Sequence, residues 1–486
     1  MDATLILTIV GLYFLLLIGV SYLTGRKDDN DAFFLGNRQS PWYIVAFGMV
    51  GASLSGVTFI SVPGWVADSG FGYMQVVLGY VLGYMVIIKV LLPLYYRLEL
   101  TSIYTYLDQR FGFYSYKTGA FFFLLSRIIG ASFRLYLVAI VLQYAVFDEF
   151  GVPFWVTVMI TILLIWIYTF RSGIKTIIWT DTLQTAFMLI AVFLTVWLIK
   201  DKLLPDQDLI SYIANSNKSQ MFFWDGWGTP NFFWTQFLSG AFITIVMTGL
   251  DQDMMQKNLS CRSLKDAQKN MFWLSITLVV VNLFFLSLGV LLYDYADMQG
   301  INEVNDRLYP AVALGGDLGL GVAIFFIIGL IAAAYSSADS ALTALTTSFC
   351  VDFLNIKKMS QEHGKQVRKQ VHIAFSIVLL LVILLFKYTV DESVIKELFV
   401  AAGYTYGPLL GLYAFGLFSK LGVKDKWVPL VAVIAPVICY VIKDNSEAWF
   451  NYKFGFELLI VNGLLTFTGL LLLAKKEKPP MVASGG

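Results

Sequence analysis

The stretch "GMVGASLSGVTFISVPGWV", residues 48–66, places glycines, hydroxyl side chains and a proline inside a long apolar segment. Glycine and serine at this density weaken a helix. Within a membrane, the backbone can leave helical geometry only where it lines a cavity or packs on protein. We therefore expect a discontinuous helix, whose freed carbonyl groups near Gly51 and Leu54 are suited to bind a cation. A small-residue face for tight helix packing is the alternative interpretation.

The composition of the whole chain is typical of a protein embedded in lipid. Of its 486 residues, 58% are hydrophobic and 14% are charged, whereas soluble proteins average about 45–50% apolar and about 25% charged residues. Apolar segments long enough to cross a bilayer recur along the chain. We predict an all-α membrane protein of about 13 transmembrane helices. The predicted spans lie near 4–24, 43–67, 72–95, 117–147, 152–170, 176–199, 233–250, 271–293, 319–352, 372–389, 394–418, 427–442 and 456–474.

Lysine and arginine residues between these spans predict the orientation. One side of the membrane holds 23 of them and the other side 8. The richer side includes Arg26 and Lys27, and also Lys257, which the predicted spans place in a loop. Because positive residues favour the cytoplasmic side, we expect the N-terminus outside and the C-terminus inside, in the plasma membrane.

We expect a single transmembrane domain over residues 1–474, followed by a short cytoplasmic tail at 475–486. The sequence shows no folded soluble module. This argues against a sensor kinase and against a membrane enzyme with a soluble catalytic head, so we expect no enzymatic activity.

A second glycine-interrupted segment, "SGAFITIVMTGLDQD" (239–253), follows the first after five spans. Two broken helices at corresponding positions of two halves indicate an inverted repeat with a binding site at the membrane midplane. The adjoining "GLDQDMMQK" (249–257) is interpreted either as part of an inner gate or as a solvated charged loop.

The segment "AAAYSSADSAL" (332–342) carries hydroxyl groups and a carboxylate in the middle of a predicted span. Ser336, Ser337 and Ser340 repeat at helical spacing and share one face, with Asp339 beside it. Asp181, in "IIWTDTLQTAF" (177–187), is expected at a similar depth. Such oxygen ligands suit a hard cation better than a transition metal. Hydrogen bonding between helices is the alternative role.

These segments, together with "TGLDQDMMQKNLSCRS" and "AAGYTYGPLLGLYAFGLF", resemble in their order the sodium:solute symporter family. The resemblance extends over about residues 4–474 and implies the LeuT-type fold. That fold is a 5+5 inverted repeat, here 43–199 and 233–418, with one preceding and two trailing helices. The resemblance also implies a monomeric, sodium-coupled secondary active symporter that imports a small organic solute by alternating access. Such a symporter is expected to need no organic cofactor and no nucleic-acid partner.

The resemblance further implies sodium ligands. The family's general sodium site matches Gly51, Leu54, Ala333, Ser336 and Ser337. Some members, including sialic acid transporters, bind a second sodium ion toward the cytoplasm, and the matching positions are Asp181, Ser336, Asp339 and Ser340. Asp339 departs from the sialic acid transporters, which have serine there. One or two sodium ions are therefore expected.

Substrate-facing positions carried over from the family are Ser53, Ser55, Thr58, Gln75, Arg127, Arg134 and Thr244. The two arginines lie seven residues apart and so on one helical face. A guanidinium in a dry site binds a carboxylate in bidentate fashion, and either arginine could take this role. The alternative for each is a structural tie to helix carbonyls or to a carboxylate of the protein. We expect an organic anion as substrate, with a neutral sugar or amino acid, or an ion channel, as alternatives.

Overall fold

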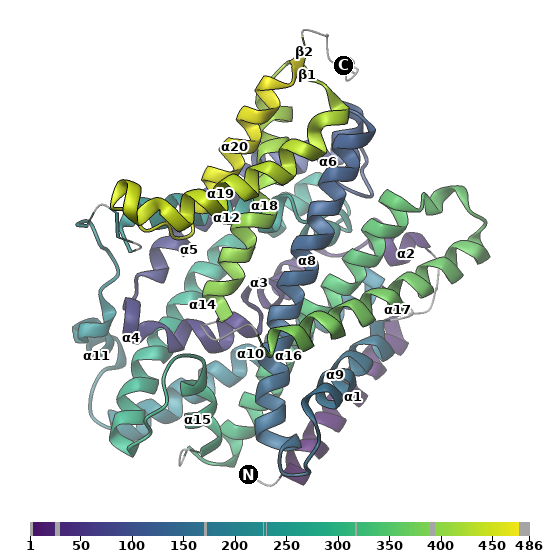
Figure 1. The fold of residues 1–486 in the computed structure, drawn as a ribbon. Coiled ribbons are helices and arrows are strands. Elements are labelled where there is room, and N and C mark those ends of the chain that lie inside the picture. The colour runs from purple at the N-terminus through teal and green to yellow at the C-terminus, as the bar shows by residue number, and fades with distance from the viewer. Residues whose placement is uncertain are drawn as a thin grey trace.

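The computed structural model is a bundle of helices that cross one another at widely different tilts (Figure 1). It describes residues 3–24, 30–169, 173–226, 228–229, 231–315, 318–388 and 394–475. Arg26, Lys27 and nearly all of the predicted cytoplasmic tail lie outside the described residues. Two short strands, β1 (Gly422–Val423) and β2 (Ala474–Lys475), form an antiparallel pair near the C-terminus.

The α-helices are α1 (Ala3–Thr24), α2 (Asn30–Leu35), α3 (Trp42–Gly64), α4 (Val66–Ser69), α5 (Tyr73–Val86), α6 (Leu92–Arg97), α7 (Thr105–Arg110), α8 (Phe113–Leu142), α9 (Phe154–Thr169), α10 (Gly173–Leu203), α11 (Leu209–Asn215), α12 (Phe233–Thr244), α13 (Gln252–Leu259), α14 (Leu264–Gln299), α15 (Leu308–Gly315), α16 (Leu320–Ser348), α17 (Gln361–Phe386), α18 (Val394–Phe418), α19 (Val428–Phe450) and α20 (Leu458–Leu472). Short π-helical segments extend α5 (Ile87–Leu91), α8 (Gln143–Phe147), α12 (Ile245–Gly249) and α16 (Phe349–Phe353). Single 3-10 turns lie at Gly36–Arg38, Asn217–Ser219, Asn305–Arg307, Ile356–Lys358 and Asp425–Trp427.

Ten helices among the described residues are long and apolar enough to cross a membrane, or eleven if one bent pair counts as a single span. Two shorter apolar helices, Phe154–Ile167 and Leu458–Leu472, lie where further spans are predicted. The all-α membrane class is thus confirmed. The count of 13 and the boundaries of the two repeats stay predictions.

Both predicted helix breaks are present. Ser55 interrupts α3 with φ 54° and ψ 172°, a conformation that no α-helix contains. In the second break, the π-helical segment Ile245–Gly249 ends α12, and the chain bends by 63° before α13. The stretch 48–66 therefore forms a discontinuous helix, as its composition predicts.

Glycines also let helices approach one another at the level of the backbone, as the alternative interpretation proposed. A Cβ atom at Gly79 of α5 would lie 2.0 Å from the Phe237 carbonyl oxygen of α12, and one at Gly240 of α12 would lie 2.1 Å from that of Val76. A Cβ atom at Gly51 would lie 2.2 Å from Thr185 Oγ1 of α10. α3 is thereby packed among α10, α14 and α16 at the centre of the molecule, with its break facing buried side chains.

Candidate functional site

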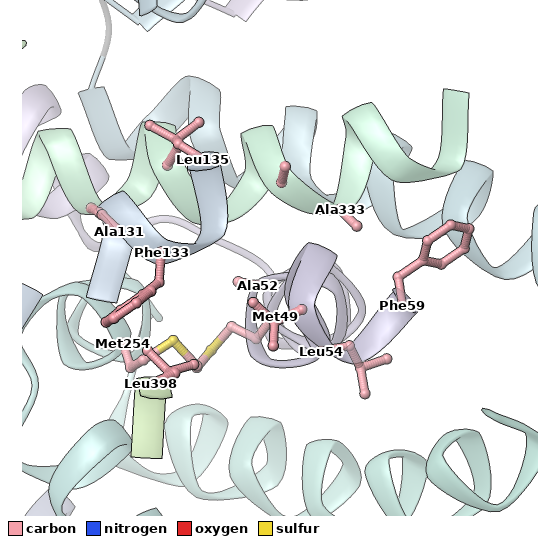
Figure 2. Close-up of a cluster of buried hydrophobic side chains, with 14 of the residues drawn as sticks. Met49, Ala52, Leu54, Phe59, Ala131, Phe133, Leu135, Met254, Ala333 and Leu398 are labelled. Carbon is pink, nitrogen blue, oxygen red and sulfur yellow. The ribbon is translucent and has the colours of Figure 1, made fainter. Parts of the chain in front are cut away.

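A small internal cavity of ≈ 90 Å³ lies beside the break in α3. Six of the seven predicted substrate residues line it, namely Ser53, Ser55, Thr58, Arg127, Arg134 and Thr244. Apolar and aromatic side chains form much of the remaining wall. Figure 2 shows Met254 and Leu398 side by side, with the side chain of Met49 extending toward them. The cavity thus joins an apolar wall to a few hydroxyl groups and two arginines.

Gln75, the seventh predicted residue, is engaged elsewhere. Its amide nitrogen donates to the Asn231 carbonyl at 3.0 Å, and its side-chain oxygen accepts from the Phe223 backbone N–H at 3.1 Å. Both ends of the amide therefore hold the segment that leads into α12. It is not among the residues that line the cavity.

The two arginines of α8 have different surroundings. Arg127 forms ion pairs with Asp253, through Nη2, and with Asp251, whose Oδ2 lies 3.8 Å from Nη1. Arg134 is only 6% exposed, and its Nε and Nη1 atoms lack a hydrogen-bond partner among the described residues. Within that part of the chain, no carboxylate lies within 4.0 Å of its guanidinium. Arg134 thus offers an uncompensated positive charge to the cavity, whereas Arg127 is already paired.

The broken part of α3 meets the hydroxyl face of α16. The Ser337 hydroxyl donates to the Ala52 carbonyl at 3.3 Å. One turn along, a Cβ atom at Gly56 would lie 3.4 Å from that of Ala334. Leu54 and Ala333 are buried in the same region. The structure therefore brings the two segments that carry the first predicted sodium site into contact, and Ala52 supplies a carbonyl that was not anticipated.

Thr185 is a second residue that sequence reasoning missed. Its hydroxyl accepts from the Gly51 backbone N–H at 3.1 Å and donates to the Asp181 carbonyl at 2.7 Å. It thereby positions the backbone of α3, just before its break, against α10. Its place one helical turn after Asp181 is the signal that could have drawn attention to it.

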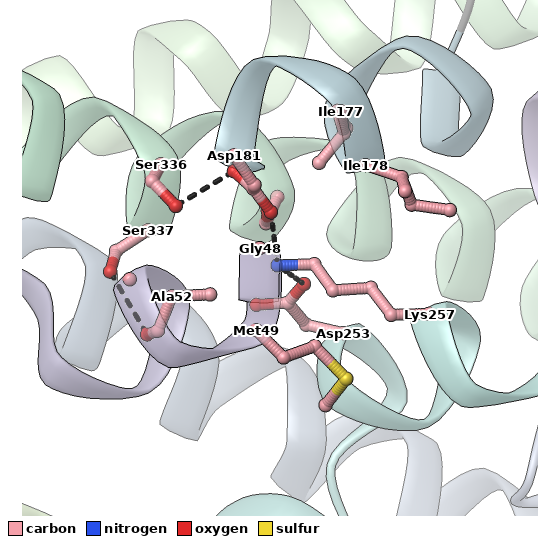
Figure 3. A network of polar contacts seen from close by, with 12 residues as sticks. Gly48, Met49, Ala52, Ile177, Ile178, Asp181, Asp253, Lys257, Ser336 and Ser337 are labelled. Carbon is pink, nitrogen blue, oxygen red and sulfur yellow. Dashed lines mark hydrogen bonds and ion pairs between the residues drawn. The ribbon is translucent and has the colours of Figure 1, made fainter. Parts of the chain in front are cut away.

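Asp181 lies at the centre of a buried polar network (Figure 3). The Ser336 hydroxyl donates to Asp181 Oδ1 at 2.7 Å. The Nζ atom of Lys257 lies 2.8 Å from Asp181 Oδ2 and 4.0 Å from Asp253 Oδ1. Because Asp253 also pairs with Arg127, the ion pairs run without interruption from α10 through α13 to α8.

This network corrects the interpretation of "GLDQDMMQK" as a solvated loop and the placement of Lys257 between spans, whereas the inner gate stays a prediction. The segment is not a solvated charged loop, since Asp251, Asp253 and Lys257 are all at most 1% exposed. Lys257 is therefore a buried residue of α13 and not a loop lysine that indicates orientation. The physical reason is the 63° bend, which turns α13 inward and makes it contact α2, α3, α10, α14 and α16.

The other two residues of the second predicted sodium site lie beside each other. The Ser340 hydroxyl donates to Asp339 Oδ1 at 3.3 Å, and both residues are buried. The second predicted sodium site thus contains oxygen atoms that could bind a cation. Its Asp181 carboxylate, however, is already in contact with the ammonium group of Lys257.

Comparison with known proteins identifies the family of the chain. The family model described as the sodium:solute symporter family matches residues 33–422. The chain belongs to the sodium:solute symporter family. This symporter is thus a multi-pass membrane transporter of a small molecule, not an enzyme, and it carries the fold and the sodium coupling of its family.

Relatives of this symporter differ in what they carry. It is 25% identical over 475 residues to the sodium/sialic acid symporter NanT of Aliivibrio fischeri, with 92% of this chain and 90% of the relative covered. It is 24% identical over 434 residues to sodium-coupled monocarboxylate transporter 1 of Mus musculus, with 85% and 67% covered. Among solved structures, a Na+-coupled sialic acid symporter in a substrate-bound outward-open state superposes with a TM-score of 0.82 at 20% identity. That alignment covers 97% of this chain and 99% of the other.

Proposed function

We propose that this symporter imports a small organic anion together with sodium, and that Arg134 binds the carboxylate of the substrate. The observation that carries the proposal is the uncompensated guanidinium of Arg134 in the cavity. A buried charge without a partner is costly, and a bound carboxylate would supply two oxygen atoms in the geometry that a guanidinium prefers. Arg127 is the weaker candidate because Asp253 and Asp251 already satisfy its charge.

The cavity favours a monocarboxylate with a short apolar body. One water molecule needs about 10–15 Å³ of such space, so ≈ 90 Å³ accommodates a solute of about the size of six to nine water molecules. Beyond the carboxylate, the substrate would meet Ile243, Met247, Leu398 and Phe399. A sugar acid of the size of sialic acid would need a larger space and more hydrogen-bonding side chains. Monocarboxylate transport among the relatives supports this choice.

We further propose that sodium binds between the break in α3 and the hydroxyl face of α16. The ligands would be the carbonyl oxygens of Gly51, Leu54 and Ala333 with the hydroxyls of Ser336 and Ser337. The contact of Ser337 with the α3 backbone supports this set. Sodium there would favour the conformation in which α3 and α16 lie together, and a ligand shifts an equilibrium only by such differential affinity. The membrane potential adds about 2.3 kcal/mol per charge per 100 mV.

The architecture proposed for this cycle is the 5+5 inverted repeat, with residues 43–199 and 233–418 as the two units. Its support is that each unit begins with a broken helix, α3 in the first and α12–α13 in the second. The distribution of lysine and arginine supports an outside N-terminus and a cytoplasmic C-terminus in the plasma membrane. A functional monomer is part of the same proposal.

A transport panel in proteoliposomes tests the proposed function. Labelled lactate, pyruvate, propionate, N-acetylneuraminate, glucose and proline are offered with an inward sodium gradient and with choline in place of sodium. We expect sodium-dependent uptake of one or more of the three monocarboxylates, above that of liposomes without protein. Uptake of N-acetylneuraminate, glucose or proline, without uptake of lactate, pyruvate or propionate, would contradict the proposed substrate class.

A further inference from the structure

We propose that the ammonium group of Lys257 is a built-in cation for Asp181, so that this symporter couples transport to one sodium ion and not to two. The inference rests on the sodium-coupled function proposed above. It concerns the second ion that Asp181, Ser336, Asp339 and Ser340 were expected to bind.

Both oxygen atoms of the Asp181 carboxylate are engaged by the protein itself. Oδ1 accepts the hydrogen of the Ser336 hydroxyl at 2.7 Å, and Oδ2 lies 2.8 Å from Lys257 Nζ. At that distance, the ammonium group forms a direct ion pair with Oδ2 and neutralises the charge of the carboxylate. The side chains of Asp181 and Lys257 are each 1% exposed, so no solvent separates the two charges.

An ammonium group and a sodium ion bind a carboxylate in the same way, through one positive charge. Each carries one positive charge and is satisfied by several oxygen atoms around it. Two such cations on one carboxylate would repel each other strongly in a buried site, where the effective dielectric constant is low. A sodium ion could thus bind Asp181 only if Lys257 moved away.

Lys257 is poorly placed to move away, because α13 is fixed on several sides. One turn before it, Asp253 is ion-paired with Arg127 of α8. The neighbouring Gln256 side chain donates to the Phe34 carbonyl at 2.7 Å and to Thr347 Oγ1 of α16 at 3.1 Å. A displaced ammonium would retain Asp253, 4.0 Å away, as its nearest acidic group among the described residues.

A cation that belongs to the chain remains in the protein throughout the transport cycle. It is not released to the cytoplasm and adds no driving force, in contrast to a second sodium ion. Ser336, a proposed ligand of the first sodium ion, also contacts Asp181, so the Lys257–Asp181 pair lies directly beside that site. One sodium ion would then balance the charge of one monocarboxylate.

Equilibrium binding of ²²Na⁺ to the purified full-length protein in detergent, without organic substrate, tests the inference. We expect one sodium ion per chain for the unmodified protein and for Lys257→Arg, which keeps the positive charge. Lys257→Met removes the charge and preserves most of the side-chain volume. Asp181 then becomes available to sodium, and the number of sodium ions bound per chain should rise from one to two. Two ions in the unmodified protein, or one in a folded Lys257→Met variant, would overturn the inference.

Asp181→Asn provides an answer even if Lys257→Met does not fold. Because Asp181 is not a sodium ligand in this account, the variant should still bind one ion per chain. A fall from one to zero would mean that Asp181 holds the sodium ion, and would overturn the inference. No binding by the unmodified protein would overturn the proposed sodium site as well, whereas two ions would leave the proposed function intact and remove this inference alone.

Discussion

Arg127 and Arg134 lie two helical turns apart on α8, yet only Arg127 is paired with carboxylates of the protein. Asp251 and Asp253 at the second helix break contact its guanidinium, while Arg134 faces the cavity without an acidic partner among the described residues. We therefore propose that Arg127 belongs to the scaffold around α13 and that Arg134 is available to a substrate. The spacing of the two arginines does not show which of them is structural and which could bind a substrate, whereas their different partners distinguish them.

Replacement of Arg134 should weaken substrate binding without affecting sodium. A hydrogen bond to a charged group contributes about 1.5–3 kcal/mol, which corresponds to about 10–150-fold in affinity. We expect Arg134→Met to raise the KM for the transported monocarboxylate within this range, and Arg134→Lys to raise it less. Sodium-dependent uptake measures the first effect, and ²²Na⁺ binding without substrate serves as control. An unchanged KM in Arg134→Met would show that the carboxylate binds elsewhere.

The hydroxyls of Ser336 and Ser337 should set the affinity for sodium. Removal of one oxygen ligand costs on the order of 1.4 kcal/mol or more, equivalent to about tenfold in affinity. Ser336→Ala and Ser337→Ala should therefore each raise the half-saturating sodium concentration of uptake about tenfold. Thr343→Ala, which removes a buried hydroxyl two turns along α16, is the matched control and should leave it unchanged. The first sodium site would be misplaced if both serine variants retained normal sodium dependence.

The Arg127–Asp253 pair should stabilise the folded protein. Removal of one member of a buried ion pair costs about 3–5 kcal/mol because the other charge is left uncompensated. We expect Asp253→Asn and Arg127→Met each to lower the unfolding temperature in detergent. The double variant should lose less stability than the sum of the losses of the two single variants, because both members of the pair are then removed together. Strictly additive losses would indicate that the two side chains do not interact.

The close contact of α5 with α12 should not tolerate a larger residue than glycine. Gly240→Ala would place a Cβ atom 2.1 Å from the Val76 carbonyl oxygen, and overpacking of this kind costs about 1–3 kcal/mol. Gly321→Ala in α16 is the control, because a Cβ atom there meets nothing within 4 Å. Thermal unfolding should show destabilisation for the first variant only. Equal unfolding temperatures would mean that α5 and α12 are not packed at backbone distance.

The helix breaks and the polar faces could be predicted from the sequence because their signals are local. Glycines and hydroxyl residues in 48–66 predict a break in this helix, which the structure has at Ser55. The spacing of Ser336, Ser337 and Ser340 predicts one hydroxyl face of α16. Both inferences depend on residues close together in the chain. The contact of Asp181 with Ser336 joins residues far apart in the chain, and only the resemblance to the family grouped these two residues.

The role of Lys257 could not be predicted because it depends on a bend. Counting charges between apolar segments assigns Lys257 to a loop, while the 63° turn before α13 directs it toward Asp181, far away in the sequence. The same turn pairs Arg127 with Asp253 and thereby distinguishes Arg127 from Arg134. The resemblance to the family implies a second sodium ion at Asp181, whereas the structure places the ammonium group of Lys257, from another helix, against this carboxylate.

Sodium-coupled transport of an organic anion is the central claim, and paired tracer flux tests it most directly. ²²Na⁺ and the ¹⁴C-labelled monocarboxylate selected by the transport panel are followed together in the same proteoliposomes. We predict that each tracer enters rapidly only when the other solute is present, at one sodium ion per carboxylate. Carboxylate uptake that proceeds equally well with choline in place of sodium, or sodium entry that ignores the carboxylate, would contradict the account.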